Sequence, residues 1–317
     1  MNIRTDFFVK FSYLLVALVL FLPSLAAAAS IPVNCNAGDT IQGALPKLKP
    51  GDTLLVSGTC LENVEVFGET GQFDGITLDG QGTATISGPD PSVNTLQLTT
   101  VRNVTVKGLR ITGGRDGLVI STGQRVGIEN TTIEQVGRHG IQVQRGTAMA
   151  HIIDSVIQNN PQIGIVVNEA SYARIGFRTP PGSSEGDTGP NLIQGNGGEG
   201  IRIQRASMAR IYVNTIRNNG QNGVLVEKMS YVEIASNTIE GNAQNGILTR
   251  NSGVLLGQDT GTGNENRPNG TETPNGRYGI EIIGVGAYAD GRLGNLNGVN
   301  GQRRYTPDTN DSLLPAF

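Results

Sequence analysis

Tryptophan is absent from this chain of 317 residues, aromatic residues make up 5%, and only 16% of residues are charged. A compact globular core of this size normally contains more large aromatic side chains. The same scarcity leaves few rings on which a sugar could stack. Basic and acidic residues nearly balance, at 24 and 27, so no strong field of one sign arises and we do not expect a nucleic-acid partner.

An apolar run from Phe11 to Leu25 follows a weakly basic start and precedes small residues at 26–30. This pattern predicts a signal peptide over residues 1–29, and therefore a protein secreted to the periplasm or the extracellular space. An uncleaved membrane anchor is the alternative. The run is short for a membrane span and Pro23 interrupts it, so we expect no stable span after cleavage.

Cysteine occurs only twice, at Cys35 and Cys60. Export favours a disulfide between them, and two free buried thiols are the alternative. No zinc-like spacing surrounds either residue, so we predict no metal site there.

Glycine, in contrast, is abundant, with 45 residues, and it marks a repeat. A Gly–apolar–x–apolar signature recurs with spacings of 23, 24, 36, 23, 23 and 33 residues, obtained by subtracting successive positions. The signature begins at Gly117, Gly140, Gly164, Gly200, Gly223, Gly246 and Gly279. One such unit cannot bury its own apolar face, whereas stacked units can, which predicts an all-β solenoid.

A second strand signature lies between successive copies of the first, and asparagines recur in register around it. Because asparagine tolerates left-handed backbone and bonds nearby main chain, we expect these columns to form stacked structural ladders. The two columns are Asn160, Asn196, Asn219 and Asn242, and Asn191, Asn214 and Asn237.

The solenoid is predicted over residues 30–300, followed by a loosely ordered tail at 301–317. Helical spacing of Ile41, Leu45 and Leu48 predicts a short amino-terminal helix that covers the apolar end of the stack. The two long spacings are interpreted as loop insertions around 177–190 and 258–276, because both are rich in Gly, Pro, Asn and Thr.

The opening motif Cys-x-Ala-Gly-Asp-Thr-Ile-Gln-x-Ala-Leu at 35–45 and the runs at 50–53, 60–64 and 76–82 resemble the entry to a pectin-lyase-like β-helix. The resemblance covers residues 31–300. It implies a single-stranded right-handed parallel β-helix of the polysaccharide-processing superfamily. The fold hosts lyases, hydrolases, epimerases, adhesins and inert scaffolds, so the resemblance is specific for fold rather than activity.

The clearest candidate site pairs Asp116 with His139, which lie 23 residues apart and hence on adjacent rungs. We predict acid–base roles for these two residues, with Arg115 and Arg138 holding a uronate carboxylate. The local pattern is similar to that of polygalacturonases, in which an Asp-Asp strand start is followed one rung later by Gly-His-Gly-Ile. The alternative is that all four residues are solvated turn residues.

This sequence departs from the polygalacturonase pattern at three places. Arg115 stands where the family has the first aspartate, Leu96 stands where it has the aspartate of Asn-Thr-Asp, and Gly176 follows Arg174-Ile175 in place of a lysine. Glycoside hydrolysis normally uses two carboxylates. Only one is present in this pattern, which therefore does not single out hydrolysis.

Other strand positions offer a polar face that could bind sugar hydroxyls or remain ordinary solvated surface. From it we predict substrate contacts by Arg202 and Arg205. The other residues of this face are Gln142, Gln144, Gln204, Glu227, Lys228 and Arg250. His151 is interpreted as a surface residue in a separate outward column with Arg174, Arg210 and Glu233.

The loop at 259–266 is rich in oxygen ligands but matches no calcium-binding repeat, and we predict neither a metal nor another cofactor. The sequence predicts an exported β-helix protein that binds or processes an acidic polysaccharide in a lyase-, hydrolase- or epimerase-like way, and a uronate-containing polymer is the class that the paired arginines suggest. The competing hypothesis is a non-catalytic scaffold for glycan binding, adhesion or cell-envelope interaction.

Overall fold

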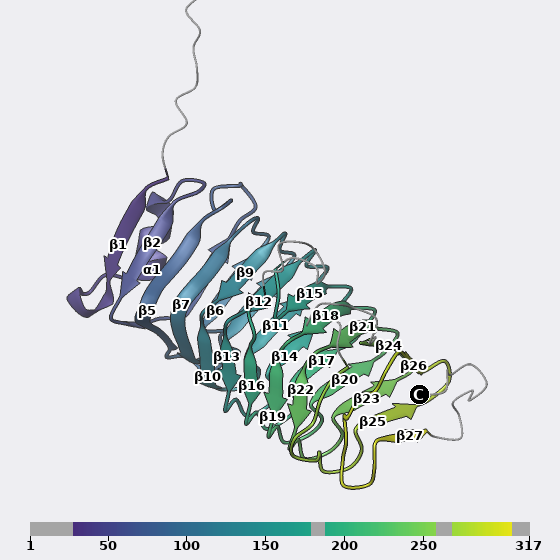
Figure 1. Cartoon of the computed structure of the whole chain (residues 1–317). Helices are drawn as coiled ribbons and strands as arrows, with labels where there is room; N and C mark the ends of the chain where they lie inside the picture. The colour runs from purple at the N-terminus through teal and green to yellow at the C-terminus, as the bar shows by residue number, and fades with distance from the viewer. Residues whose placement is uncertain (1–27, 179–187, 258–267, 306–317) are drawn as a thin grey trace, which may run out of the picture.

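The computed structural model of the protein describes residues 28–178, 188–257 and 268–305. These residues form a right-handed parallel solenoid of short strands, with one short α-helix near the amino-terminal end (Figure 1). The predicted fold class is confirmed. Most of the predicted signal peptide, residues 1–27, lies outside the described part of the chain.

One side of the solenoid is a ten-stranded parallel sheet, and seven of its strands carry the Gly–apolar–x–apolar signature. Each strand pairs with the equivalent strand of the next rung, as in Ile141 opposite Ile165 and Ile165 opposite Ile201. In order along the solenoid the strands are β4 (Val64–Phe67), β6 (Leu96–Thr99), β8 (Leu118–Ser121), β11 (Ile141–Gln144), β14 (Ile165–Val167), β17 (Ile201–Ile203), β20 (Val224–Glu227), β23 (Ile247–Arg250), β25 (Ile280–Ile283) and β27 (Arg303–Tyr305).

The remaining strands form a 17-stranded sheet that bends around the other sides. Its long strands β5 (Thr77–Gly88) and β7 (Thr105–Gly113) pair with two different runs of shorter strands. The first run is β1 (Ser30–Asn34), β2 (Thr53–Ser57), β9 (Val126–Glu129), β12 (Ala150–Ile153), β15 (Tyr172–Ile175), β18 (Met208–Tyr212), β21 (Tyr231–Ala235), β24 (Gly253–Leu256) and β26 (Tyr288–Asp290). The second run is β3 (Thr59–Leu61), β10 (Thr132–Val136), β13 (Val156–Gln158), β16 (Leu192–Gln194), β19 (Thr215–Arg217) and β22 (Thr238–Glu240).

The core lies inside the solenoid, where small aliphatic side chains stack in columns. Ile133, Ile157, Ile193, Ile216 and Ile239 occupy successive rungs and are all fully buried. Each buried isoleucine stabilises the fold by about 1.5–3 kcal/mol relative to an exposed one. Repetition of one small side chain at each level explains how the chain forms a core without tryptophan.

The two asparagine columns are buried ladders at the turns, as the sequence predicts. The Nδ2 group of Asn219 donates to Oδ1 of Asn242 at 2.9 Å, and its own Oδ1 accepts from Nδ2 of Asn196 at 3.0 Å. In the second ladder Asn214 donates to Asn237 at 3.0 Å. Each side chain also bonds main-chain groups of neighbouring rungs, so the ladders satisfy buried turn backbone that would otherwise lack partners.

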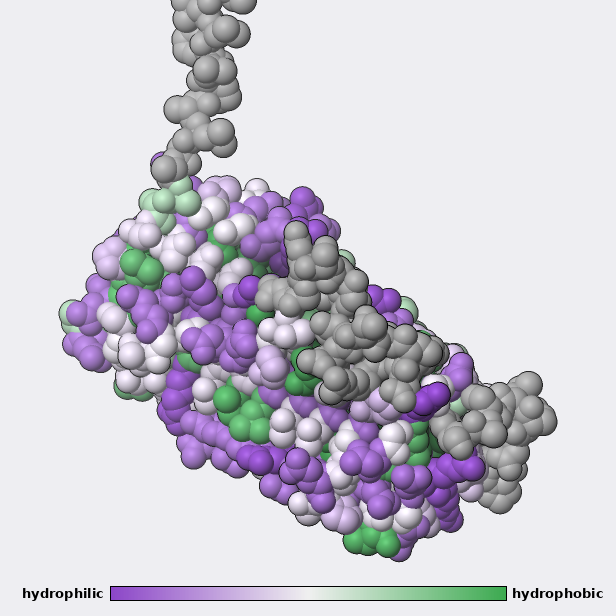
Figure 2. Space-filling view, viewed as in Figure 1, coloured by the Kyte–Doolittle hydropathy of each residue, from purple (hydrophilic) through white to green (hydrophobic). Residues whose placement is uncertain are grey.

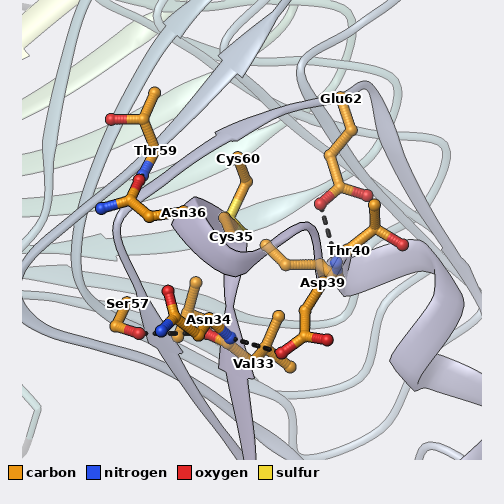
Figure 3. The surroundings of a disulfide bond; sticks show 12 residues. Val33, Asn34, Cys35, Asn36, Asp39, Thr40, Ser57, Thr59, Cys60 and Glu62 are labelled. Atoms are coloured by element: carbon orange, nitrogen blue, oxygen red, sulfur yellow. Dashed lines mark hydrogen bonds between the residues drawn. A yellow bond between two sulfur atoms is a disulfide. The ribbon is translucent and has the colours of Figure 1, made fainter.

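A short helix covers the amino-terminal end of the stack, as predicted. Helix α1 (Ile41–Ala44) begins after Thr40, whose side chain accepts from the Gly43 N–H at 3.0 Å. The Glu62 carboxylate accepts from the N–H groups of Ile41 and Gln42, the first two residues of the helix (Figure 3). The 3₁₀ turns η1 (Cys35–Ala37) and η2 (Leu45–Lys47) flank this helix.

The predicted disulfide between Cys35 and Cys60 is present and ties η1 to β3 (Figure 3). It closes a loop with a sequence separation of 25. Because the cross-link restricts the unfolded chain, we expect a Cys35→Ser, Cys60→Ser variant to lose about 3 kcal/mol of unfolding free energy. Urea denaturation of both proteins would measure this difference. An unchanged midpoint and slope would show that the cap is held by its hydrogen bonds alone.

The structure revises the predicted limits of the loops and the tail. Asn269 and Asn275 fall within the predicted insertion 258–276, yet they are buried members of the two ladders, and the strand-like pairing resumes at Gly270. Phe177, predicted as the first insertion residue, is fully buried against Tyr212. The solenoid continues through β27 into the predicted tail, and residues 306–317 lie outside the described ranges. None of the helices in those ranges is both long and apolar enough to cross a bilayer.

Candidate functional site

The outer face of the ten-stranded sheet carries three columns of outward side chains. One column precedes each repeat glycine, the second is the residue between the two apolar positions of the signature, and the third is the residue that follows the second apolar position. Many of these side chains are nevertheless inaccessible, including the apolar Val119, Val166, Leu225 and Leu248. The sequence pattern identifies the columns, but it does not show that long neighbouring side chains cover them.

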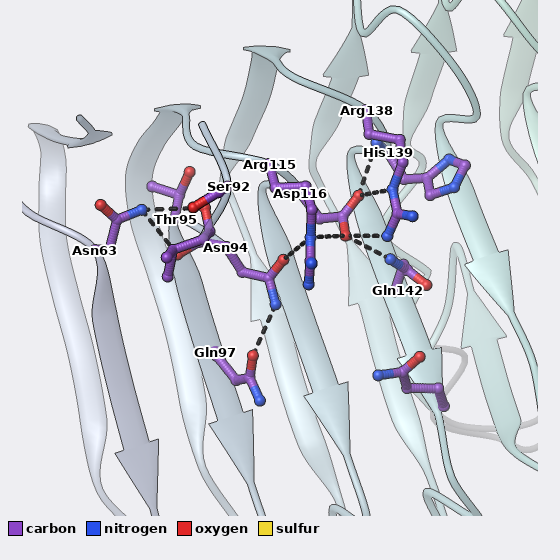
Figure 4. Close-up of polar contacts among 12 residues, drawn as sticks. Asn63, Ser92, Asn94, Thr95, Gln97, Arg115, Asp116, Arg138, His139 and Gln142 are labelled. Atoms are coloured by element: carbon purple, nitrogen blue, oxygen red, sulfur yellow. Dashed lines mark hydrogen bonds and ion pairs between the residues drawn. The ribbon is translucent and has the colours of Figure 1, made fainter. Parts of the chain in front are cut away.

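Asp116, in the first column, is fully buried and accepts four hydrogen bonds (Figure 4). Arg138 donates through Nε at 2.9 Å and through one terminal nitrogen at 2.5 Å. The His139 N–H and Nε2 of Gln142 donate at 3.1 and 2.7 Å. Burial alone would raise the pKa of Asp116, but the Arg138 bonds, the His139 N–H and the nearby positive charges outweigh it and lower the pKa. Asp116 is therefore a bound carboxylate and not a solvated turn residue.

The His139 imidazole is neutral at pH 7. Burial lowers its pKa to about 4, and Arg138 and Arg202 add to the effect while Asp116 opposes it. Its Nδ1 accepts a hydrogen bond from the Ile163 N–H at 3.2 Å, so the ring proton lies on Nε2. The Asp116 carboxylate bonds the main chain of His139 rather than the ring. The side chain therefore offers an Nε2–H donor, while its acceptor nitrogen is already used.

Arg115 joins this network from the other side. Its Nε donates to Oδ1 of Asn94 at 3.2 Å and lies 3.6 Å from the Asp116 carboxylate. Asn94 in turn donates to Gln97 at 2.7 Å (Figure 4). Arg115 and Arg138, which the sequence assigns to one uronate carboxylate, therefore both lie near the same oxygen of Asp116.

A second buried carboxylate lies further along the same face. Glu227 is only 3% exposed, and Arg202, Lys228 and Arg250 surround it at 2.8, 3.2 and 3.6 Å. Burial would raise the pKa of Glu227, but the charge of Arg202 and the bond and charge of Lys228 lower it.

A third buried carboxylate, Glu281, is also 3% exposed. Arg277 and Arg304 lie 3.8 and 3.7 Å from it, and Asn245 donates to it at 2.8 Å. No feature of the sequence pattern distinguished Glu281, because an outward strand position predicts exposure.

Two residues of the predicted polar face are buried, contrary to the sequence interpretation: Gln142 at 8% exposure and Glu227 at 3%. Gln142 is bound to Asp116, and Glu227 lies beneath its three cations. Arg202 lies on this face, whereas Arg205 lies after β17 at a left-handed turn position and pairs with Glu169 at 3.3 Å.

The second histidine lies on the other sheet. The predicted column of His151, Arg174, Arg210 and Glu233 is confirmed by the register of β12, β15, β18 and β21. His151 is not a simple surface residue, however, because its Nδ1 is buried.

Among the described residues, one group could in principle hold a metal, namely Cys35, Cys60 and Glu62. The disulfide uses both sulfur atoms, and Glu62 caps helix α1. The oxygen-rich loop at 259–266 lies outside the described ranges.

Comparison with protein families gives two overlapping matches to the family described as the right handed beta helix region, at residues 74–253 and 146–286. The chain belongs to this family. No curated protein matches it in sequence.

Solved structures of similar fold include pectate lyase Pel9A, with 13% sequence identity and a TM-score of 0.56 over 93% of this chain and 80% of that chain. The A-module of the Azotobacter vinelandii mannuronan C-5 epimerase AlgE6 has 15% identity and a TM-score of 0.54 over 88% and 89%. At these identities the similarity establishes the shared β-helix fold.

Proposed function

We propose that this β-helix protein is exported and binds an acidic polysaccharide along the outer face of its ten-stranded sheet. The observation that carries the proposal is the arrangement of cations over three buried carboxylates. Asp116, Glu227 and Glu281 are surrounded by two, three and two basic side chains, whose exposed fractions range from 28% to 51%.

These clusters leave positive charge exposed on a protein whose net charge is −3. Seven cations contact three carboxylates, and two further glutamates on the same face, the buried Glu199 and the exposed Glu65 of β4, reduce the surplus to two positive charges. The clusters lie at β8, β20 and β25, which are four and two strand steps apart, or about 19 and 10 Å at a spacing of ~4.8 Å. A spaced row of half-exposed guanidinium groups suits a chain with repeated carboxylates better than a single small ligand.

The hydropathy of the exposed residues also favours a polar ligand. In the face shown in Figure 2, apolar residues form small separate patches within a largely hydrophilic surface. The disulfide fits an oxidising compartment, and the two similar structures named above are enzymes whose names refer to pectate and mannuronan. A polyuronate is therefore the first ligand to test.

We expect an Arg115→Gln, Arg250→Gln, Arg304→Gln variant to bind polygalacturonate about tenfold more weakly than the wild type, since three half-exposed contacts together supply about 1.4 kcal/mol. These arginines lie 3.6–3.7 Å from their carboxylates, so their loss leaves the closer cations in place. Isothermal titration calorimetry at two salt concentrations would measure the change, because salt screens such contacts.

The matched control is Arg110→Gln with Arg217→Gln, since both arginines lie on the 17-stranded sheet. This pair should leave the affinity unchanged. Equal weakening by both sets of substitutions, or equal binding of a neutral galactan, would rule out a specific site on the ten-stranded sheet.

Catalysis is the second candidate function, and the Nε2–H of His139 favours it, because this donor lies within the field of Arg138 and Arg202. In this proposal the neutral His139 donates a hydrogen bond from Nε2–H to an oxygen of the bound sugar, and the Asp116 carboxylate positions His139 through its main-chain N–H. An absorbance assay for unsaturated products on polygalacturonate and alginate tests lyase activity. Turnover that His139→Gln abolishes without loss of binding would support an enzyme, and wild-type binding without turnover would support a scaffold.

A further inference from the structure

A small cavity of about 210 Å³ lies on the 17-stranded sheet, away from the three carboxylate clusters. Residues of β9 and β12, of the turns before β7 and β9, and Arg178 line it. The side chains that matter for its chemistry are those of Thr105, Arg125, Glu129, His151 and Arg178.

The register of the sheet explains why the cavity exists. Thr105, Gly127 and His151 occupy one outward position on the adjacent strands β7, β9 and β12. The missing side chain of Gly127 leaves a space between the other two. A Cβ atom added there would lie 3.3 Å from Oε1 of Glu129 and 3.6 Å from Oγ1 of Thr105, so a larger side chain would occupy the cavity.

The charges around the cavity are mainly positive. Among the described residues that line the cavity, Glu129 is the one carboxylate, and it pairs with Arg178 at 2.6 Å. Burial lowers the pKa of His151 to about 4, and the charges of Arg174, Arg125 and Arg178 lower it further. Three guanidinium groups therefore act on the ring, and only one carboxylate of the lining opposes them.

His151 also carries a hydrogen-bonding atom that no described residue uses. Its Nδ1 is buried and has no partner among the described residues. Unsatisfied buried polar atoms are uncommon and often indicate a missing ligand or ion. In the tautomer with the proton on Nδ1, this atom is a donor, which an anionic oxygen would accept.

We propose that this cavity is a binding site for one small oxyanion, such as sulfate, phosphate or a single sugar carboxylate. Its volume of about 210 Å³ lies below the ~300 Å³ at which sites for larger ligands begin. The cavity is therefore matched to a single small anionic group. The Arg125 and Arg178 guanidinium groups bind the anion, and His151 Nδ1 donates to it.

The chain has two histidines, which makes this site open to a direct test. We expect sodium sulfate, added to ¹⁵N-histidine-labelled protein at constant ionic strength, to shift the imidazole signals of His151 saturably and to leave those of His139 in place. Gly127→Val, which fills the cavity, and Arg125→Gln should each weaken the affinity at least about tenfold, the equivalent of about 1.4 kcal/mol. Gly127→Ala provides a smaller filling change should the valine variant fail to fold.

The matched control is Arg110→Gln. Like Arg125→Gln, this change removes one guanidinium group of the same sheet, but Arg110 lies in β7 outside the cavity lining and pairs with Glu134. Phosphate, D-galacturonate and neutral D-galactose are the other probes. Stronger binding of inorganic anions would identify a free ion as the ligand, and stronger binding of galacturonate without a galactose response would identify an acidic sugar.

No saturable His151 shift with any of the three anions, or equal affinity in Arg125→Gln and Arg110→Gln, would overturn the proposal. The site is independent of the polysaccharide face. The Arg115→Gln, Arg250→Gln, Arg304→Gln variant should therefore bind sulfate at His151 as the wild type does.

Discussion

Replacement of Asp116 by alanine is expected to lower the free energy of unfolding by about 4 kcal/mol. The substitution removes the shared acceptor of Arg138, the His139 N–H and Gln142. Arg138 is 38% exposed and can turn toward water, so most of the loss comes from the two neutral donors, at about 1–3 kcal/mol each. Urea denaturation followed by circular dichroism would measure it.

The acid dependence of stability provides a second readout for Asp116. Its pKa is lowered in the folded protein, so its contribution is fully present above the unfolded value of about 3.9. That contribution is lost as the pH falls through the lower folded pKa. The difference in stability between wild type and Asp116→Ala should therefore shrink below about pH 4. Asp79→Ala is the control, because Asp79 is 19% exposed and forms a surface pair with Lys107. A loss below 1 kcal/mol for both variants would show that Asp116 is not a structural acceptor.

Replacement of Asn219 by alanine in the middle of its ladder is expected to cost about 4 kcal/mol as well, since it leaves two buried donors without an acceptor. These donors are the N–H and the Nδ2 group of Asn196. The substitution also removes the bonds from Asn219 to Asn242 and to the Ile193 carbonyl. Thermal denaturation of the folded variant would show the loss as a lower midpoint.

The control for this ladder is the neighbouring residue. Asn218 is exposed and has a left-handed φ of 53°, which glycine adopts without strain. Asn218→Gly should therefore cost less than about 1 kcal/mol, because it removes an amide that water can replace. If the two substitutions were equally harmful, the turn conformation rather than the ladder would stabilise the rungs.

The fold could be predicted because a solenoid converts sequence spacing into position. The 23-residue interval from Gly117 to Gly140 places Asp116 beside His139, and the structure shows their contact through the main chain. The asparagine ladders follow from the same spacing, whereas the disulfide was predicted because export favours pairing of the two cysteines. Asn269 and Asn275 were missed for two reasons: the insertion at 258–276 breaks the 23-residue interval, and its composition is typical of a loop.

Burial on the outer face could not be predicted in this way. Alternation shows that Glu227 points outward, but its exposure depends on where Arg202, Lys228 and Arg250 place their long side chains. The tautomer of His139 depends on the Ile163 N–H, which lies on a neighbouring rung. The cavity near His151 results from one absent side chain, at Gly127, which the sequence shows only once the register between strands is known.

The stacking of rungs has a consequence for how ligand length could be selected. The charged clusters at β8, β20 and β25 are separated by whole numbers of strands. The distance between two clusters is therefore a multiple of the strand spacing, about 4.8 Å. Gain or loss of one rung between β11 and β17 would move the Asp116 and Glu227 clusters apart or together by one strand step and leave the ion pairs within each cluster intact, because those pairs use the rungs on either side of that interval. The number of rungs can thus set the distance between charged clusters while the residues within each cluster stay the same.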